Sequence, residues 1–199
     1  MPKRKHPQEY LAEAEYQANV KRALERIYGQ VTVQWCPFRG EGRATYAPRV
    51  DVAVGPYAVR DRRIEDYTAM MEGTRPFIEQ LLKRHNRNLE GFGERTYFDE
   101  ILHFNENSRC FLAIEIEESG SRKHCLGNLV NASALGRIGL LVARTEKVFR
   151  VFLRQRAYLK FLADVGKNTF NTANALVLTQ GQFDECLQSL EPGSQENGA

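Results

Sequence analysis

The sequence predicts an α/β protein with a central mixed β-sheet flanked by helices. Three observations support this class. Apolar residues recur at helical spacing in several segments of the 199-residue chain. Between them lie short runs in which apolar and polar residues alternate, as is typical of strands. Glycine, proline and helix-capping residues separate the two kinds of segment. Their alternation along the chain favours strands joined by helices over an all-α or all-β fold.

The first half of the chain is predicted to contain one helix, two strands and a longer helical segment. Gly29 ends the first helix. Pro76 interrupts the longer segment, because proline cannot continue a helix. Residues 88–109 show no regular pattern. In order, the elements are a helix over residues 8–28, strands over 31–35 and 49–54, and helical turns over 61–88.

The second half alternates strictly between strand and helix. Ser121 and Thr145 are expected to cap two of the helices. The first of these helices is rich in small residues, which would let it lie close to a neighbouring sheet. The elements are strands over 111–117, 138–143 and 175–178, and helices over 122–135, 146–164 and 183–190. The strand over 138–143 is apolar throughout, as expected of a central strand buried on both faces.

Composition limits the classes of partner and compartment. The chain has a net charge of +3, which permits a polyanionic partner without requiring one. The four cysteines are scattered without a CxxC pair, so reduced thiols and a cytoplasmic location are expected. No apolar run is long enough to cross a bilayer, so no membrane partner is expected. We expect one domain over residues 1–190 and a disordered tail over 191–199.

Two glutamates share one face of the strand over 111–117. Alternation places Glu115 and Glu117 on the face of Phe111 and Ala113, opposite the aliphatic residues. A buried strand should not carry two neighbouring anions unless a cation lies between them. Asp51 interrupts the valines of the strand over 49–54 in the same way. If these strands are neighbours, the three carboxylates converge on one site.

Such a site suits a hard divalent cation. Mg²⁺ prefers carboxylate oxygens, with water and substrate phosphate completing its shell. The next helix begins with Arg122, Lys123 and His124, and helix amino termini beside cations are natural phosphate sites. Carboxylates for a metal beside a phosphate-ready helix indicate phosphodiester hydrolysis.

These residues resemble a known superfamily. Pro48-Arg-Val-Asp51 followed by Glu115-Ile-Glu117 is similar to the PD-(D/E)xK motif of restriction-endonuclease-like nucleases. The element order from residue 8 to about 143 resembles that family's αβββαβ core. The resemblance implies that Asp51, Glu115 and the main-chain carbonyl of Ile116 bind Mg²⁺, or Mn²⁺ as a substitute. It further implies an endonuclease that cuts double-stranded DNA as a homodimer. The interval between Asp51 and Glu115 is long for the family, so we expect residues 60–105 to form a helical insertion.

The chain departs from the family at one motif position. Glu117 stands where most members carry lysine, although glutamate is known there in some restriction enzymes. We expect Glu117 to bind metal and to orient or deprotonate the attacking water, while Lys123 or a second metal ion replaces the missing cation. Asp99 is an alternative first acid. The competing interpretation is a catalytically inactive nuclease fold that serves as a nucleic-acid-binding or assembly module.

Several further polar residues have structural and functional interpretations that the sequence leaves open. Asn131, in the small-residue helix, is expected to be a buried, hydrogen-bonded amide. Glu65 and Glu79 are expected to be solvated. Five arginines are candidates either for DNA contacts or for ordinary surface charge: Arg39, Arg43, Arg60, Arg62 and Arg63. The recognition sequence, the number of metal ions and the choice between DNA and another nucleic acid stay open.

Overall fold

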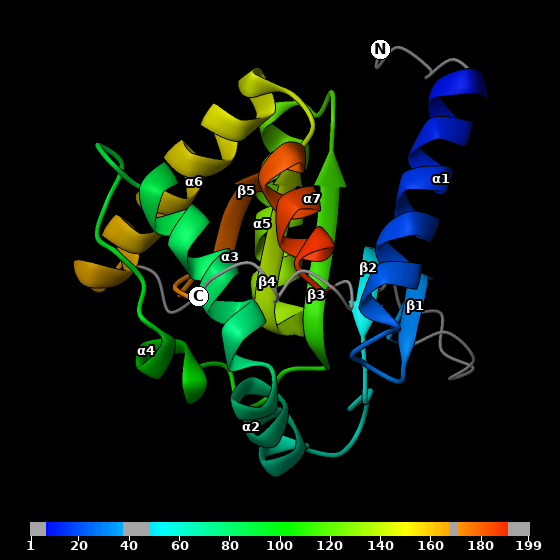
Figure 1. The fold of residues 1–199 in the computed structure, drawn as a ribbon. Coiled ribbons are helices and arrows are strands. Elements are labelled where there is room, and N and C mark those ends of the chain that lie inside the picture. The colour runs from blue at the N-terminus through cyan, green and yellow to red at the C-terminus, as the bar shows by residue number, and fades with distance from the viewer. Residues whose placement is uncertain (1–6, 38–47, 168–170, 191–199) are drawn as a thin grey trace, which may run out of the picture.

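Five strands form one open mixed sheet in the order of the sequence. The computed structural model describes residues 7–37, 48–167 and 171–190 (Figure 1). Strands β1, β2 and β3 form an antiparallel meander, and β4 and β5 run parallel to β3. Their bounds are β1 Val31–Trp35, β2 Val50–Val54, β3 Cys110–Glu117, β4 Gly136–Ala143 and β5 Ala175–Thr179. The predicted α/β class with a mixed sheet is confirmed.

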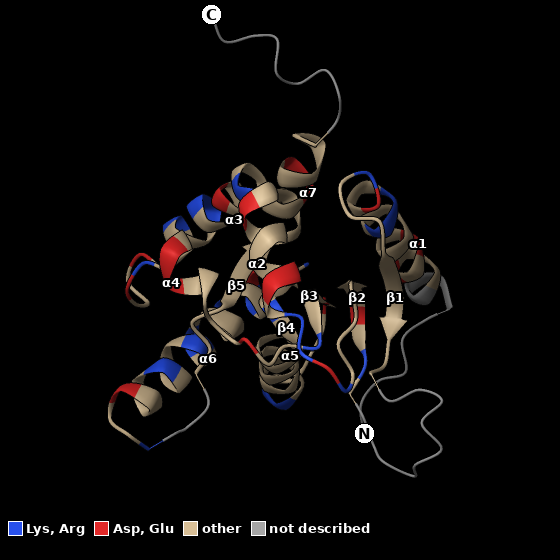
Figure 2. Ribbon diagram, turned by 90° about the horizontal axis from the view of Figure 1, so that it is seen from below, with Lys and Arg blue, Asp and Glu red and all other residues tan. Residues whose placement is uncertain are grey.

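Helices cover both faces of the sheet (Figures 1 and 2). One face packs against α1 (Pro7–Leu24), α3 (Arg75–Asn88) and α7 (Gln180–Gln188), which share one apolar cluster with residues of all five strands. The opposite face packs against α5 (Arg122–Leu135) and α6 (Glu146–Asp164) in a second cluster. Two further helices, α2 and α4, lie in the segment between β2 and β3 and span Ile64–Gly73 and Phe98–Leu102.

Most predicted boundaries lie within a few residues of the observed ones. Ser121 and Thr145 cap α5 and α6 as expected, each accepting a hydrogen bond from the third residue of its helix. Pro76 lies in the first turn of α3, directly after α2 ends. The last helix begins at Gln180 rather than at Phe183, because Thr179 and Gln182 form a capping box there.

The expected close approach of the small-residue helix to the sheet is present. A Cβ added at Gly139 of β4 would lie 2.7 Å from the backbone carbonyl carbon of Ala132 in α5. Ala132 and Ser133 are both buried. Backbone therefore meets backbone at this contact, which holds α5 tightly across β3 and β4.

One predicted side-chain direction is wrong. Phe111 does not share the face of Ala113 but packs with the aromatic residues of the opposite cluster, 5.4 Å from Tyr28 and 6.2 Å from Tyr67 between ring centroids. The pairing of β2 with β3 ends at Leu112, where the chain after Val54 turns away. Beyond that point the strand has no β2 neighbour to hold its alternation.

Three further expectations concern the cysteines, membrane-spanning helices and residues outside the described ranges. Cys36, Cys110, Cys125 and Cys186 are free thiols. In the described ranges no helix is long and apolar enough to cross a membrane. Arg39, Arg43 and the tail over residues 191–199 lie outside the described residues.

Candidate metal centre at the end of strands β2 and β3

The strand register places Asp51 beside Glu115. Strands β2 and β3 pair Val52 with Ile114 and Ala53 with Ala113, so Asp51 and Glu115 are the next residues opposite each other. Directly opposed residues of an antiparallel pair point to the same face. The expected neighbourhood of these two strands, on which the convergence of the acids depended, is therefore present.

The two acids interlock through the backbone. The N–H of Ile116 donates to Asp51 Oδ2 at 2.7 Å, and the backbone N–H of Asp51 donates to the Glu115 carboxylate. The N–H and C=O of one strand residue point to the same side. The Ile116 carbonyl therefore faces β2 and Asp51, while the Glu117 carbonyl faces β4 and accepts from the N–H of Arg144 at 2.8 Å.

Two glutamine side chains hold the other oxygen of Asp51. Gln17 of α1 and Gln34 of β1 each donate an amide N–H to Asp51 Oδ1, at 3.1 and 2.9 Å. Gln34 also donates to Gln17 Oε1 at 3.1 Å. Gln34 has a φ of +51°, an irregular backbone conformation on the strand next to Asp51. Sequence reasoning missed both residues, although Gln17 lies three residues before Val20 on the buried face of α1.

Two asparagines of α5 meet the two glutamates of β3. The side-chain amide of Asn131 hydrogen-bonds to the Glu115 carboxylate, and Asn128 Nδ2 donates to Glu117 Oε2 at 3.2 Å. Residues three apart share a helix face, as residues two apart share a strand face. The expected hydrogen bond of Asn131 is confirmed and its partner is one of the candidate metal ligands, but the residue is only partly buried, not buried as expected.

The Glu117 carboxylate is bound by its own turn. Its Oε1 accepts the backbone N–H groups of Glu118 and Ser119, both at 3.0 Å. His124 Nδ1 lies 3.8 Å from Glu117 Oε2. A Cβ at Gly120 would lie 2.6 Å from the carboxylate carbon of Glu117, so the turn closes directly over this side chain.

Burial and the charges of neighbouring carboxylates make Asp51 and Glu115 hard to ionise. Burial raises the pKa of Asp51 from 3.8 to about 6, and the charges of Glu13 and Glu117 add to this. Burial, then the charge of Asp51, raises the pKa of Glu115 well above its ordinary value. Glu115 is 4% exposed, and its Oε1 has no hydrogen-bond partner among the residues that the structure describes. A buried oxygen of this kind is stabilised by a cation.

The other acidic candidates lie away from this site. Asp99 of α4 has a side chain that is 89% exposed and faces Arg75 at 4.0 Å. Asp51, not Asp99, is therefore the acid beside Glu115. Glu65 and Glu79 are exposed, as expected.

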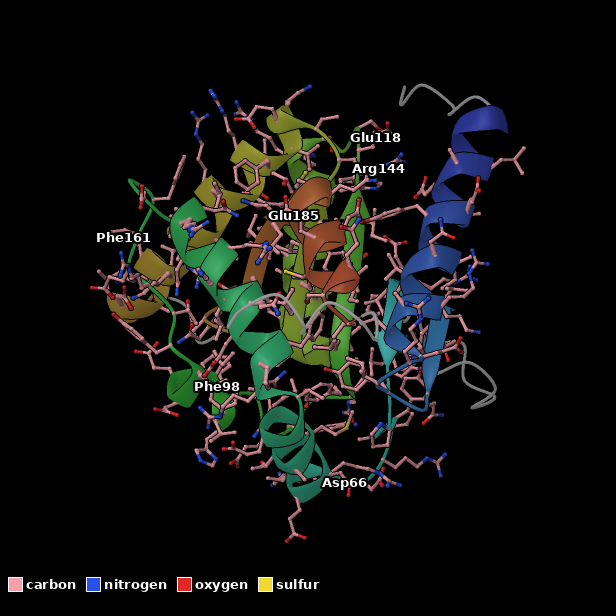
Figure 3. All side chains as sticks on the ribbon, viewed as in Figure 1. Asp66, Phe98, Glu118, Arg144, Phe161 and Glu185 are labelled. Carbon is pink, nitrogen blue, oxygen red and sulfur yellow. The ribbon has the colours of Figure 1, made fainter. Side chains whose placement is uncertain are left out.

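The cationic candidates do not approach the acids. Lys123 is exposed on the first turn of α5, and in the described part of the chain no hydrogen bond or ion pair joins it to Asp51, Glu115 or Glu117. Arg63 pairs with Asp61 and Asp66 near α2. Figure 3 shows Asp66 at the far end of the molecule from Glu118, which follows the acids. The arginines from Arg60 to Arg63 thus lie remote from the candidate site.

The donor set fits a magnesium site built on two carboxylates. Across the described ranges, no three His, Cys, Asp or Glu side chains form a group that could hold a metal ion. Mg²⁺ commonly takes only one or two carboxylates, with water and substrate phosphate filling the remaining positions. Asp51 and Glu115 supply hard oxygens, and Glu115 Oε1 is buried without a donor. Asp51, Glu115 and the carbonyl of Ile116 supply oxygen donors of the kind that such a site uses, and Glu117 accepts hydrogen bonds from its own turn and from Asn128.

No family model, no curated protein and no solved structure matches this chain. The assignment of a function therefore depends on the geometry of the site and on the order of the elements around it.

Proposed function

We propose that the protein is a metal-dependent endonuclease that hydrolyses DNA phosphodiester bonds, with a restriction-endonuclease-like core of the PD-(D/E)xK type. One observation carries the proposal. Asp51 and Glu115 are linked by hydrogen bonds across the ends of β2 and β3. The surrounding elements follow in the order helix, three-stranded antiparallel meander, crossover helix and parallel strand. The buried and unpartnered Glu115 Oε1 supports a cation at this place.

In this proposal Asp51, Glu115 and the main-chain carbonyl of Ile116 hold Mg²⁺, which Mn²⁺ can replace. When bound, the ion would lower the pKa of a water molecule and neutralise charge on the scissile phosphate. Gln17, Gln34 and Asn131 fix the orientation of the two carboxylates through the hydrogen bonds described above. The metal ligands are thus oriented before substrate arrives.

Glu117 and Lys123 have different places in the proposal. Glu117 accepts two backbone hydrogen bonds and one from Asn128, which suits a residue that positions the start of α5. To act on the attacking water, as its motif position implies, its carboxylate would have to exchange one of these bonds. Lys123 projects from the first turn of α5 into solvent. In this position it is better placed to contact a substrate phosphate than to contact Asp51 or Glu115.

Incubation of supercoiled plasmid DNA with the protein and Mg²⁺ or Mn²⁺ tests the proposal. Asp51→Asn and Glu115→Gln should each reduce cleavage by about a hundredfold or more, since each removes a metal ligand. Asp99→Asn, an exposed acid in the same chain, is the matched control and should cleave like the wild type. Undiminished cleavage by Asp51→Asn and Glu115→Gln, with the fold intact by circular dichroism, would overturn the assignment.

A homodimer is part of the same proposal, because each site cuts one strand of a duplex. Light scattering coupled to size exclusion measures it directly. Linear plasmid formed without an accumulating nicked intermediate is the expected product pattern of a dimer.

One observation favours a second candidate function, the inactive nuclease fold that binds nucleic acid or assembles. No lysine or arginine among the described residues is bonded to the side chain of Asp51, Glu115 or Glu117, and His124 Nδ1 lies 3.8 Å from Glu117 Oε2. Calorimetric titration with Mg²⁺ and Mn²⁺ separates the two candidates. Metal binding that disappears in Asp51→Asn supports the enzyme, and DNA binding without any metal binding supports the module.

A further inference from the structure

Helix α6 carries a continuous exposed stripe on the side facing away from the sheet. Steps of three and four residues place its members on one line along the helix. The residues of this α6 stripe are Lys147, Arg150, Arg154, Tyr158 and Phe161, together with Val165 directly after the last residue of the helix. All six are exposed, and the three apolar ones expose 59%, 58% and 49% of their surface. Figure 3 shows Phe161 at the outer edge of the molecule.

The stripe is cationic in its first half and aromatic in its second. Arg150 pairs with Glu146 at 2.7 Å. Among the described residues, no ion pair joins Lys147 or Arg154 to a carboxylate. Figure 2 shows the basic segments along α6. Exposed cations without carboxylate partners followed by exposed aromatic rings are the two components of a surface that binds single-stranded nucleic acid.

The first turn of α5 lies between helix α6 and the acids of β3. The first turn of α5 exposes Arg122, Lys123 and His124. This turn is fixed to α6, because Gln155 Nε2 donates to the carbonyl of Arg122 at 2.6 Å. At its other side His124 lies 3.8 Å from Glu117. Basic groups therefore extend from the acids, across the start of α5, onto α6.

We propose that the α6 stripe is the docking track for a single-stranded segment of the nucleic-acid substrate. Phosphates contact Lys147, Arg150 and Arg154, and unpaired bases stack on Tyr158 and Phe161. From Lys147 to Tyr158 the helix rises about 16 Å, enough for a few nucleotides of strand. The identity of the substrate rests on the proposed function, and the inference adds that duplex DNA with an adjoining single-stranded segment is bound more tightly than blunt duplex.

Fluorescence anisotropy with a labelled 20-nucleotide single strand and with the matching duplex, both in EDTA, tests the track without cleavage. Lys147→Glu combined with Arg154→Glu should weaken binding of both DNAs more than tenfold. It should also reduce the steepness of the salt dependence, since two phosphate contacts are lost. Tyr158→Ala combined with Phe161→Ala should weaken binding of the single strand at least tenfold and that of the duplex less than twofold.

Lys83→Glu combined with Arg87→Glu is the matched control, since both residues are exposed on α3, which packs on the opposite face of the sheet. Equal losses in this control, or wild-type affinity in both stripe variants, would overturn the track. So would light scattering that shows a wild-type dimer becoming a monomer in the Tyr158 and Phe161 variant, because a second copy of the chain would then occupy the stripe.

Hydrolysis of bis(4-nitrophenyl) phosphate with Mn²⁺ distinguishes this inference from the proposed function. This small diester needs the metal centre but not the track, so the stripe variants should hydrolyse it at the wild-type rate. If the wild type hydrolyses the diester and the stripe variants bind DNA as tightly as the wild type, the docking track is overturned and the proposed enzyme is not. Stripe-dependent DNA binding with neither hydrolysis nor plasmid cleavage supports the track and overturns the proposed enzyme.

Discussion

Neutralising Asp51 should stabilise the metal-free protein in a strongly pH-dependent way. Its pKa rises from 3.8 to about 6 because the carboxyl is buried beside other acids. Each pKa unit corresponds to about 1.4 kcal/mol, so the ionised form weakens folding by about 3 kcal/mol. A carboxyl whose pKa is raised on folding stabilises the protein below pH 3.8, and that contribution is lost as the pH rises to about 6.

Asn at position 51 carries no charge at any pH and so avoids this loss. It keeps one oxygen acceptor of the two that Ile116, Gln17 and Gln34 now use, which weakens folding by about 1–2 kcal/mol at every pH. The free energy of unfolding of Asp51→Asn relative to wild type should therefore increase by about 3 kcal/mol between pH 3.5 and pH 7.

Urea unfolding at a series of pH values in EDTA measures this difference, with Asp99→Asn as the exposed control. Parallel stability curves for Asp51→Asn and wild type would refute the reasoning, because they would show that Asp51 is not destabilised by ionisation. Repeating the series with saturating Mg²⁺ should remove the advantage of the variant above pH 6. Under those conditions the ion binds the wild type alone and stabilises it by about 3 kcal/mol at a hundred times its dissociation constant.

Two further predictions concern the scaffold around the site. Gly139→Ala should lower the free energy of unfolding by about 1–3 kcal/mol, because the new methyl group meets the Ala132 backbone. Gly127→Ala, on the exposed side of α5, should raise the free energy of unfolding by up to about 1 kcal/mol. Thermal denaturation of both variants checks the two signs. Burial, then the charge of Arg156, lowers the pKa of His85, so the wild type should lose stability as the pH falls below about 6.5. His85→Gln should lose less stability over this pH range than the wild type. It should also lose less than a variant of the exposed His103. Acid titrations followed by circular dichroism test this, and identical acid transitions in the three proteins would contradict it.

The pairing of Asp51 with Glu115 could be predicted because it depends only on strand periodicity and strand neighbourhood. Alternation places each acid on a face, and an antiparallel meander brings the two strands together. The caps at Ser121 and Thr145 were predictable for a similar reason, since helix capping is a local interaction.

The amides around the acids were not predictable in the same way. Gln17 and Gln34 reach Asp51 from a helix and a strand whose relative position no local pattern specifies. The engagement of Glu117 by its own turn was also hidden, because it depends on the close approach that Gly120 permits. Phe111 lies on the opposite face from the predicted one because β2 does not reach it: the last pair of β2 and β3 joins Val54 to Leu112.

The backbone interlock of Asp51 and Glu115 has a consequence for how this chain could be altered. Both acids and the N–H of Ile116 belong to β2 and β3, and their spacing is set by the pairing of those two strands. The segment between the strands, with α2, α3 and α4, contributes no atom to these hydrogen bonds. The exposed residues 93–95 of the connection between α3 and α4 are thus a suitable place to insert a foreign domain or affinity tag, because the spacing of the carboxylates does not depend on the length of this connection.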